Sequence, residues 1–170
     1  GPAVVMGVSG GALIALLCAA RRPRAVRAVV ADSFTPVWTE SLLRARIAER
    51  ASRSELQQRF WSFGHGDDWA SVVDADTRWM EQRLSEGGID ITDALPRVSV
   101  PVLLTGTLSD EIVHDVGERL MAAARSIPSA ELYVCGEGGH PLAWTAPERF
   151  WSVCGPFLRR VTAAPAATEA

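Results

Sequence analysis

The apolar positions of this chain fall into short β-branched runs separated by longer segments with helical spacing. The first run, 3–8, breaks into glycines around Ser9 and continues as an Ala- and Leu-rich segment to about Arg22. That order predicts a strand, a sharp turn and a helix. Strands that alternate with helices form parallel sheets, so we expect an α/β fold with a mostly parallel sheet and flanking helices. The other predicted core elements are strands over 26–31, 100–106 and 130–135, and helices over 115–126 and from 145 onward.

The segment 35–97 differs from the rest of the chain, because arginine and glutamate alternate there with single apolar residues. This pattern predicts a helical insert without strands. The core is then expected to comprise 1–34 and 98–161, and 162–170 to be a flexible Ala-, Pro- and Thr-rich tail. Within the insert we expect helices over 40–50, 54–62 and 68–86.

The composition is that of a globular protein. Of the 170 residues, 48% are hydrophobic and 22% are charged, and the longest apolar run, near 12–20, is much shorter than the roughly 20 residues of a membrane-spanning helix. A net charge of −3 without a dense basic cluster argues against nucleic-acid binding. Cys18, Cys135 and Cys154 lie far apart in apolar segments, which predicts buried free thiols and a reducing, cytoplasmic location.

The chain opens directly on its first predicted strand, without an initiator methionine. We therefore expect it to be the C-terminal portion of a longer protein. The strand before Ser9 would then be an unprotected sheet edge, which favours pairing with another chain or formation of a homo-oligomer.

Ser9 lies in the sequence Gly7-Val8-Ser9-Gly10-Gly11, which has the G-x-S-x-G spacing of a nucleophile turn between a strand and a helix. The serine backbone is strained in such a turn, so we expect glycine to be required at both Gly7 and Gly11. The turn would expose the Ser9 hydroxyl at the carboxyl end of the sheet and offer the Gly10 N–H to an oxyanion. Because the chain has 14 glycines, the same letters are also compatible with an ordinary glycine-rich helix start.

An acid and a histidine follow two of the later predicted strands. Asp110 comes just after the third strand and His140 after the fourth, so both are expected at the same sheet edge as Ser9. Serine becomes a good nucleophile when a neutral imidazole takes its proton, and a carboxylate orients that imidazole. The three residues therefore predict a Ser-His-Asp site. Asp32, at the end of the second strand, is the alternative acid, and Glu111 is a weaker alternative.

This pattern resembles the α/β-hydrolase fold, in particular capped hydrolases that include esterases and carbon-carbon bond hydrolases. The residues that carry the resemblance are 7–11, 101–106 with Asp110, and 138–141 followed by 147–150. The resemblance implies a serine hydrolase that cleaves a small ester or a similar activated acyl substrate, with 35–97 as a helical cap. A carbon-carbon bond hydrolase or a haloperoxidase-like enzyme on the same residues is an alternative.

The resemblance covers only the C-terminal half of that fold. The family's earlier strands, and the His-Gly loop that supplies its second oxyanion N–H, have no counterpart in this sequence. This departure leaves open a truncated chain that is inactive alone and prone to association.

The predicted insert is rich in aromatic residues. Trp38, Phe60, Trp61 and Trp69 fit two interpretations, either the packing layer of a small helical unit or an apolar lid over a substrate pocket. The second interpretation would make them part of the binding site for a small-molecule substrate.

Two further histidines, His65 and His114, are expected on the surface. His65 lies near Asp67 and Asp68, but their spacing matches no standard metal-ligand pattern. The glycines around Ser9 lack the third glycine and the lysine of dinucleotide- and nucleotide-binding loops. We therefore expect neither a metal nor a cofactor.

Overall fold

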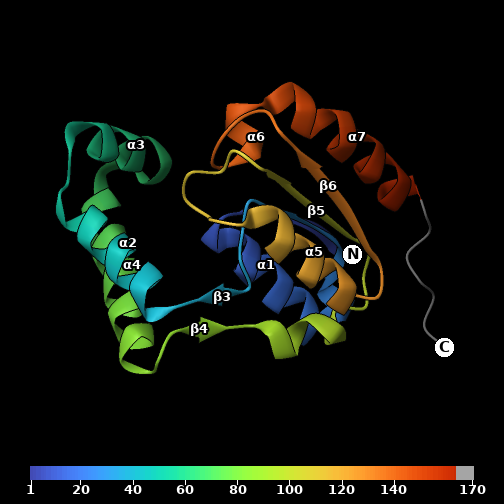
Figure 1. Ribbon diagram of the computed structural model, residues 1–170, viewed down its shortest axis with the longest axis horizontal. Coiled ribbons are helices and arrows are strands. Elements are labelled where there is room, and N and C mark those ends of the chain that lie inside the picture. Colours follow the sequence, from blue (N-terminus) through green and yellow to red (C-terminus); the bar gives the residue numbers. More distant parts are fainter. Residues whose placement is uncertain (164–170) are drawn as a thin grey trace. The chain divides into compact units, whose positions relative to one another are not determined.

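The computed structural model describes residues 1–163, and the chain divides into two compact units. One unit comprises Gly1–Pro36 and the chain from Ile91 onward, and the other comprises Val37–Asp90. Figure 1 shows a sheet with flanking helices in the first unit and a group of helices in the second. The second unit lies within the predicted insert 35–97, whose role as a cap stays a prediction.

A four-stranded parallel sheet forms the centre of the first unit (Figure 1). Its strands, within the described residues, are β1 (Ala3–Val8), β2 (Val26–Asp32), β5 (Val102–Thr107) and β6 (Ala130–Cys135), in the order β1, β2, β5, β6. All three pairings are parallel, and at the carboxyl ends the register pairs Asp32 with Val8 on one side and with Thr105 on the other. The α/β fold expected from the sequence is therefore confirmed.

Helices cover both faces of this sheet. α1 (Gly10–Arg21) and α5 (Val116–Ser126) lie on one face, and α7 (Pro147–Ala163) lies on the other (Figure 1). The unit also contains α6 (Leu142–Thr145) and the short 3-10 helices η1 (Pro23–Ala25) and η3 (Thr92–Arg97). Among residues 1–163, none of the helices is both long enough and apolar enough to span a bilayer.

The face of the sheet beneath α7 is built from alternate strand residues. Ala28, Val30 and Leu103 pack there with Phe150 and Phe157 of the helix, and all five are buried. Successive side chains of a strand point to opposite faces, so the alternation that brings in residues 28 and 30 also directs the side chain of residue 32 to this face. That position carries an aspartate, which enters the site described below.

The second unit is built from three helices and a pair of very short strands. The helices are α2 (Glu40–Ala51), α3 (Glu55–His65) and α4 (Trp69–Ser85), with the 3-10 turn η2 (Gly66–Asp68) between the last two. Ser54 and Gln57 form a capping box at the start of α3. The strands β3 (Val37–Trp38) and β4 (Ile89–Asp90) pair antiparallel and contradict the expected lack of strands. Two residues are too few to show the alternation from which a strand is predicted.

The C-terminal elements differ from the prediction in two places. The last helix begins at Pro147 rather than at residue 145, because Thr145 ends the separate helix α6. The Thr145 hydroxyl accepts the Gly139 N–H of the preceding loop. Residues 162 and 163 belong to α7 rather than to a tail, and the remaining predicted tail, 164–170, lies outside the described residues.

The three cysteines are free, but only one of them is buried. Cys154 lies on the buried face of α7, Cys135 is half-buried, and Cys18 is exposed. Burial, together with the nearby charge of Asp32, raises the pKa of the Cys154 thiol to about 11. The prediction of buried thiols is therefore confirmed for Cys154 alone. Cys135 is only half-buried, and Cys18 is exposed because the helix face that carries it is not covered within the described residues.

Candidate active site

Ser9 stands in a strained turn between β1 and α1. Its backbone has φ 52° and ψ −125°, a region that non-glycine residues rarely occupy, and it is the N-cap of α1. The Ser9 N–H donates to the carbonyl of Asp32 at 2.8 Å, which ties the turn to the end of β2. Gly10 is the first residue of α1, so no carbonyl of that helix accepts its N–H.

Glycine is required at one of the two predicted positions in this turn. A Cβ on Gly7 would lie 2.2 Å from the carbonyl oxygen of Gly11, far inside contact distance. A Cβ on Gly11 would meet no atom within 4 Å, and Gly11 has no positive φ. The expectation that both positions need glycine is therefore wrong for Gly11, whose backbone, not its missing side chain, makes the close approach.

Asp110 and His140 are joined directly at this edge of the sheet. His140 Nδ1 lies 2.9 Å from Asp110 Oδ2, and only 9% of the His140 side chain and 0% of the Asp110 side chain are exposed. The other carboxylate oxygen of Asp110 accepts the N–H groups of Ile112 at 2.9 Å and Val113 at 2.7 Å. An ionised carboxylate can only accept hydrogen bonds, so this contact places the ring proton on Nδ1 and leaves a lone pair on Nε2.

The pKa of Asp110 lies below its ordinary value. Burial alone would raise this pKa, but the hydrogen bonds from His140, Val113 and Ile112, together with the charge of His140, outweigh burial. Asp110 is therefore ionised at neutral pH, as the carboxylate that orients an imidazole must be.

Asp32 reaches the same edge but makes different contacts. Its side chain is buried, Oδ1 accepts the hydroxyls of Thr105 at 2.7 Å and Ser33 at 3.2 Å, and Oδ2 accepts the Ala143 N–H at 3.0 Å. Burial raises the pKa of Asp32, and these hydrogen bonds and the nearby charge of His140 oppose the increase. Since the ring of His140 bonds to Asp110, the geometry favours Asp110 over Asp32 as the orienting acid.

Ser9 shares this edge without a direct link to the other two residues. Among residues 1–163, no hydrogen bond joins the Ser9 hydroxyl to the His140 ring, which bonds to Asp110. The connection runs through Asp32, whose carbonyl accepts the Ser9 N–H and whose carboxylate accepts the Ala143 N–H. Catalytic hydrogen bonds are often longer before substrate binds. The catalytic roles of Ser9, His140 and Asp110 stay a prediction.

Side chains of two further residues hold the backbone of the loop that carries His140. Glu111 accepts the His140 N–H at 3.0 Å, and the Thr145 hydroxyl accepts the Gly139 N–H at 2.8 Å. Glu111, considered above as a weaker acid, therefore contacts the backbone of His140 rather than its ring.

Sequence reasoning missed Ser33, Thr105 and Thr145 as part of this site. Thr105 lies 73 positions from Asp32 in the chain, and only the register of β2 and β5 brings the two together. The available signal was a hydroxyl residue at or next to the carboxyl end of an apolar strand, which applies to Ser33 and Thr105. No comparable signal marks Thr145.

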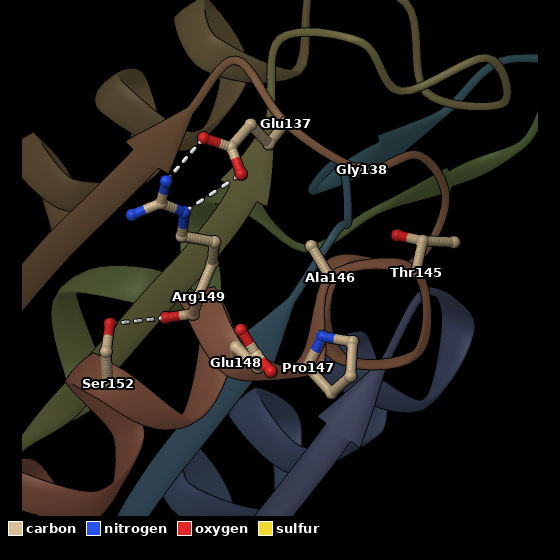
Figure 2. A pocket seen from close by; sticks show the side chains of 8 residues that line it. All are labelled: Glu137, Gly138, Thr145, Ala146, Pro147, Glu148, Arg149 and Ser152. Carbon is tan, nitrogen blue, oxygen red and sulfur yellow. Dashed lines mark hydrogen bonds and ion pairs between the residues drawn. The ribbon is translucent and has the colours of Figure 1, made fainter.

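An open depression of about 620 Å³ lies beside the His140 loop, at the start of α7 (Figure 2). Arg149 forms a bidentate ion pair with Glu137 there, at 2.9 and 2.5 Å, which fastens the beginning of the loop to α7 (Figure 2). Ser9, Asp110 and His140 do not line this depression. Its lining residues are Glu137, Gly138, Thr145, Ala146, Pro147, Glu148, Arg149 and Ser152.

The aromatic residues considered as a lid all belong to the second unit. Trp38 is in β3, Phe60 and Trp61 are in α3, and Trp69 opens α4. The rings of Trp61 and Trp69 stack with centroids 5.8 Å apart, and the Arg53 guanidinium lies 5.8 Å from the Trp69 centroid. These contacts support packing within the unit, and a role at a substrate pocket stays a prediction.

The two remaining histidines lie on the surface, as expected. His65 ends α3 and His114 lies just before α5, and both are exposed. Over the part of the chain that the structure describes, no group of three or more histidine, cysteine, aspartate or glutamate residues is placed to hold a metal ion.

Comparison with known families gives a match over most of the chain. Residues 1–153 match the family described as "Alpha/beta hydrolase family". Ser9, Asp110 and His140 all lie within that span. A search of the curated proteins finds no match.

Several solved structures share this fold at low sequence identity. NosK from Streptomyces actuosus has a TM-score of 0.78 at 22% identity, over 95% of this chain and 71% of NosK. An E-2-(acetamidomethylene)succinate hydrolase has a TM-score of 0.70 at 22% identity, over 94% and 67% of the two chains. The esterase Pf2001 from Pyrococcus furiosus has a TM-score of 0.59 at 22% identity, over 92% and 52%. The chain thus spans about half the length of that esterase.

Proposed function

Because this chain belongs to the alpha/beta hydrolase family, we propose that it carries the reacting residues of a serine hydrolase. The proposed substrate is a small ester or a similar activated acyl compound. Ser9 is the nucleophile, His140 acts first as general base and then as general acid, and Asp110 orients the imidazole.

In the proposed reaction the Ser9 oxygen attacks the carbonyl carbon of the ester while His140 Nε2 takes the hydroxyl proton. The bond from that carbon to the alcohol oxygen then breaks, and His140 returns the proton to the leaving alcohol. A water molecule, deprotonated by His140 in the same way, then attacks the acyl carbon. The bond from that carbon to the Ser9 oxygen breaks, His140 returns the proton to Ser9, and the acid leaves. The Gly10 N–H, which no carbonyl of α1 accepts, is the proposed donor to the oxyanion in both steps.

One observation carries the proposal, namely the 2.9 Å contact between His140 Nδ1 and Asp110 Oδ2 at the carboxyl edge of the sheet. It leaves Nε2 as the atom free to accept a proton. The positive φ of Ser9 supports the same function, because such strain in non-glycine residues is concentrated at functional sites. The choice of an ester over carbon-carbon bond or halide chemistry rests on the family resemblance alone.

A fluorophosphonate tests the nucleophile, since it phosphonylates activated serines. Peptide mass spectrometry of the treated, folded chain should place the adduct on Ser9, and Ser9→Ala should abolish it. Ser126→Ala is the matched control, because Ser126 is an exposed serine at the end of α5 and should not affect labelling. A folded protein without any adduct on Ser9 would reject the proposed role.

Turnover assays then separate the reaction classes. Hydrolysis of p-nitrophenyl esters by the parent, lost in Ser9→Ala, supports the ester hydrolase. Turnover of a β-diketone but not of esters favours the carbon-carbon bond hydrolase, and halide oxidation with peroxide and a carboxylic acid favours the haloperoxidase-like enzyme.

The open edge of β1 supports a second candidate function, which is association with another chain and no activity alone. Within residues 1–163, β1 pairs with β2 only, and the side chains of Met6 on β1 and Ile14 on α1 are each 51% exposed. A free strand edge with apolar side chains is a site where another strand can pair. A second copy of this chain, presenting the same edge, is the proposed partner.

Sedimentation velocity tests this association. The parent should sediment as a dimer and Met6→Lys as a monomer, because a charge at a strand edge opposes pairing. Met121→Lys is the matched control, since Met121 is 47% exposed on α5 and should leave the dimer intact. A parent that is monomeric at all concentrations rejects the second candidate.

A further inference from the structure

The loop that carries His140 is held at each of its backbone donors. Between Gly139 and Ala143 there are four N–H groups, because Pro141 has none, and each donates to a side-chain oxygen. In chain order the acceptors are Thr145 at 2.8 Å, Glu111 at 3.0 Å, Ser33 at 3.0 Å and Asp32 at 3.0 Å. The first two acceptors are exposed and the last two are buried, so Ser33 and Asp32 hold the loop where water cannot substitute for them.

Asp32 is placed for this by the sheet. It ends β2 with its side chain on the face beneath α6 and α7, and the neighbouring strand presents its register partner Thr105. The carboxylate accepts three donors, the hydroxyls of Thr105 and Ser33 and the N–H of Ala143. An acceptor-only group with three donors directed at it is fixed in orientation, so it can fix the loop in turn.

The same residue is bonded to the turn that carries Ser9. The Asp32 carbonyl accepts the Ser9 N–H at 2.8 Å, while its carboxylate reaches the loop three residues beyond His140. The next residue, Ser33, has φ 52°. Its hydroxyl donates to the Asp32 carboxylate and accepts the Leu142 N–H. One dipeptide therefore contacts both segments that must meet for a proton to pass between Ser9 and His140.

We propose that Asp32 is a positioning residue that, together with Ser33, fixes the loop carrying His140 at the distance from Ser9 that proton transfer requires. The inference rests on the proposed function and goes beyond it, because it assigns a second carboxylate a role without contact to the reacting atoms. Asp32 acts through hydrogen-bond geometry and not as a second acid.

Two substitutions of Asp32 separate geometry from charge. In Asp32→Asn the amide oxygen can accept the Ala143 N–H while the NH₂ group donates to the Thr105 hydroxyl, so the loop stays held and only the charge is lost. In Asp32→Ala both the acceptor and the charge are lost. Val29→Ala is the stability control, because it opens a cavity at a fully buried position of the same strand, away from the site.

The experiment measures two independent quantities on the full chain. Amide hydrogen exchange by NMR, which needs no catalysis, reports how firmly Leu142 and Ala143 are held. In Asp32→Ala we expect exchange at Ala143 to accelerate about tenfold or more, and in Asp32→Asn and Val29→Ala to stay near the parent value. Ester turnover should show kcat reduced about 10- to 100-fold in Asp32→Ala with little change in KM, and within about tenfold of the parent in Asp32→Asn.

The outcomes distinguish this inference from the proposed function. If the parent does not turn over esters, the function fails, and the exchange data still decide whether Asp32 holds the loop. If kcat falls as far in Asp32→Asn as in Asp32→Ala, the charge of Asp32 and not its hydrogen-bond geometry determines the rate, and the inference is overturned. It is also overturned if Asp32→Ala keeps the parent kcat or the parent exchange rate. Where Asp32→Ala does not fold, Ser33→Ala replaces it, with faster exchange at Leu142 as the expected result.

Discussion

Replacing Asp110 by asparagine would change one atom and reverse the proton arrangement of His140. The Oδ1 position accepts two backbone N–H groups, those of Ile112 and Val113, so the amide oxygen of the asparagine must stay there. The NH₂ group is then the atom that faces His140 Nδ1, at the place where Oδ2 accepts the ring proton. Two donors cannot face each other, so the ring must move its proton to Nε2. In that tautomer Nε2 cannot accept the proton of Ser9.

Two effects of different size follow from these contacts. Loss of the correct tautomer should reduce kcat/KM about 10³- to 10⁴-fold, equivalent to about 4–5.5 kcal/mol in activation free energy. The backbone contacts of Asp110 survive, so the free energy of unfolding should fall by only about 1.5–3 kcal/mol, the value of one hydrogen bond to a charged group. Asp110→Ala would also leave the N–H groups of Ile112 and Val113 without acceptors and should cost about 2–6 kcal/mol more.

The assay combines ester turnover with thermal unfolding of parent, Asp110→Asn and Asp110→Ala. Glu118→Gln is the control for charge, since Glu118 is an exposed acid in the first turn of α5. We expect the control to match the parent in both measurements. An Asp110→Asn protein that keeps more than about a tenth of the parent kcat/KM would refute the reasoning, because the tautomer argument leaves no route to that rate.

Three further predictions concern stability. Because the folded pKa of Asp110 is lowered, its contribution to the free energy of unfolding should be fully present above its unfolded pKa of about 3.9 and be lost as pH falls through the folded pKa. The difference in stability to urea between parent and Asp110→Asn should therefore shrink toward about pH 3, and a constant difference contradicts this. The sign is opposite for Asp32, whose folded pKa is raised, so the free energy of unfolding of the parent should fall as pH rises from about 3.9 through the folded pKa. The stability of Asp32→Asn relative to the parent should therefore increase across that pH range, and a decrease would contradict this. Gly7→Ala should lower the unfolding temperature strongly or prevent folding, since its Cβ meets backbone atoms at 2.2–2.7 Å, whereas Gly11→Ala should be neutral or gain about 0.5 kcal/mol; equal effects in calorimetry would be inconsistent with this geometry.

The sequence predicted the core of the first unit because its elements have strong periodic signals. The apolar runs that became β1, β2, β5 and β6 are β-branched and are separated by helical spacing, which defines a parallel α/β sheet. The carboxyl ends of parallel strands lie at one edge of a sheet, and for this reason the sequence alone predicts that Asp110 and His140 lie close together.

The remaining features depend on register and close approach, which a single sequence does not encode visibly. The alternation of Gly7 and Gly11 around Ser9 suggests two equivalent glycines, yet the clash exists only at Gly7, because the backbone of residue 11 passes over it. In the sequence Asp32 is only an alternative acid at the end of a strand. Its contacts with Thr105 and the Ala143 N–H depend on strand register and on the path of the loop. The two-residue strands β3 and β4 are too short to produce a pattern.

The central claim is that Ser9, His140 and Asp110 work as one unit, and a double-mutant cycle tests it most directly. The rate at which a fluorophosphonate modifies Ser9 is measured in the parent, His140→Ala, Asp110→Asn and the double variant. Asp110 acts only through His140, so we expect the double variant to be labelled no more slowly than His140→Ala alone. A double variant whose slowing equals the product of the two single effects would show that the residues act independently and would contradict the account.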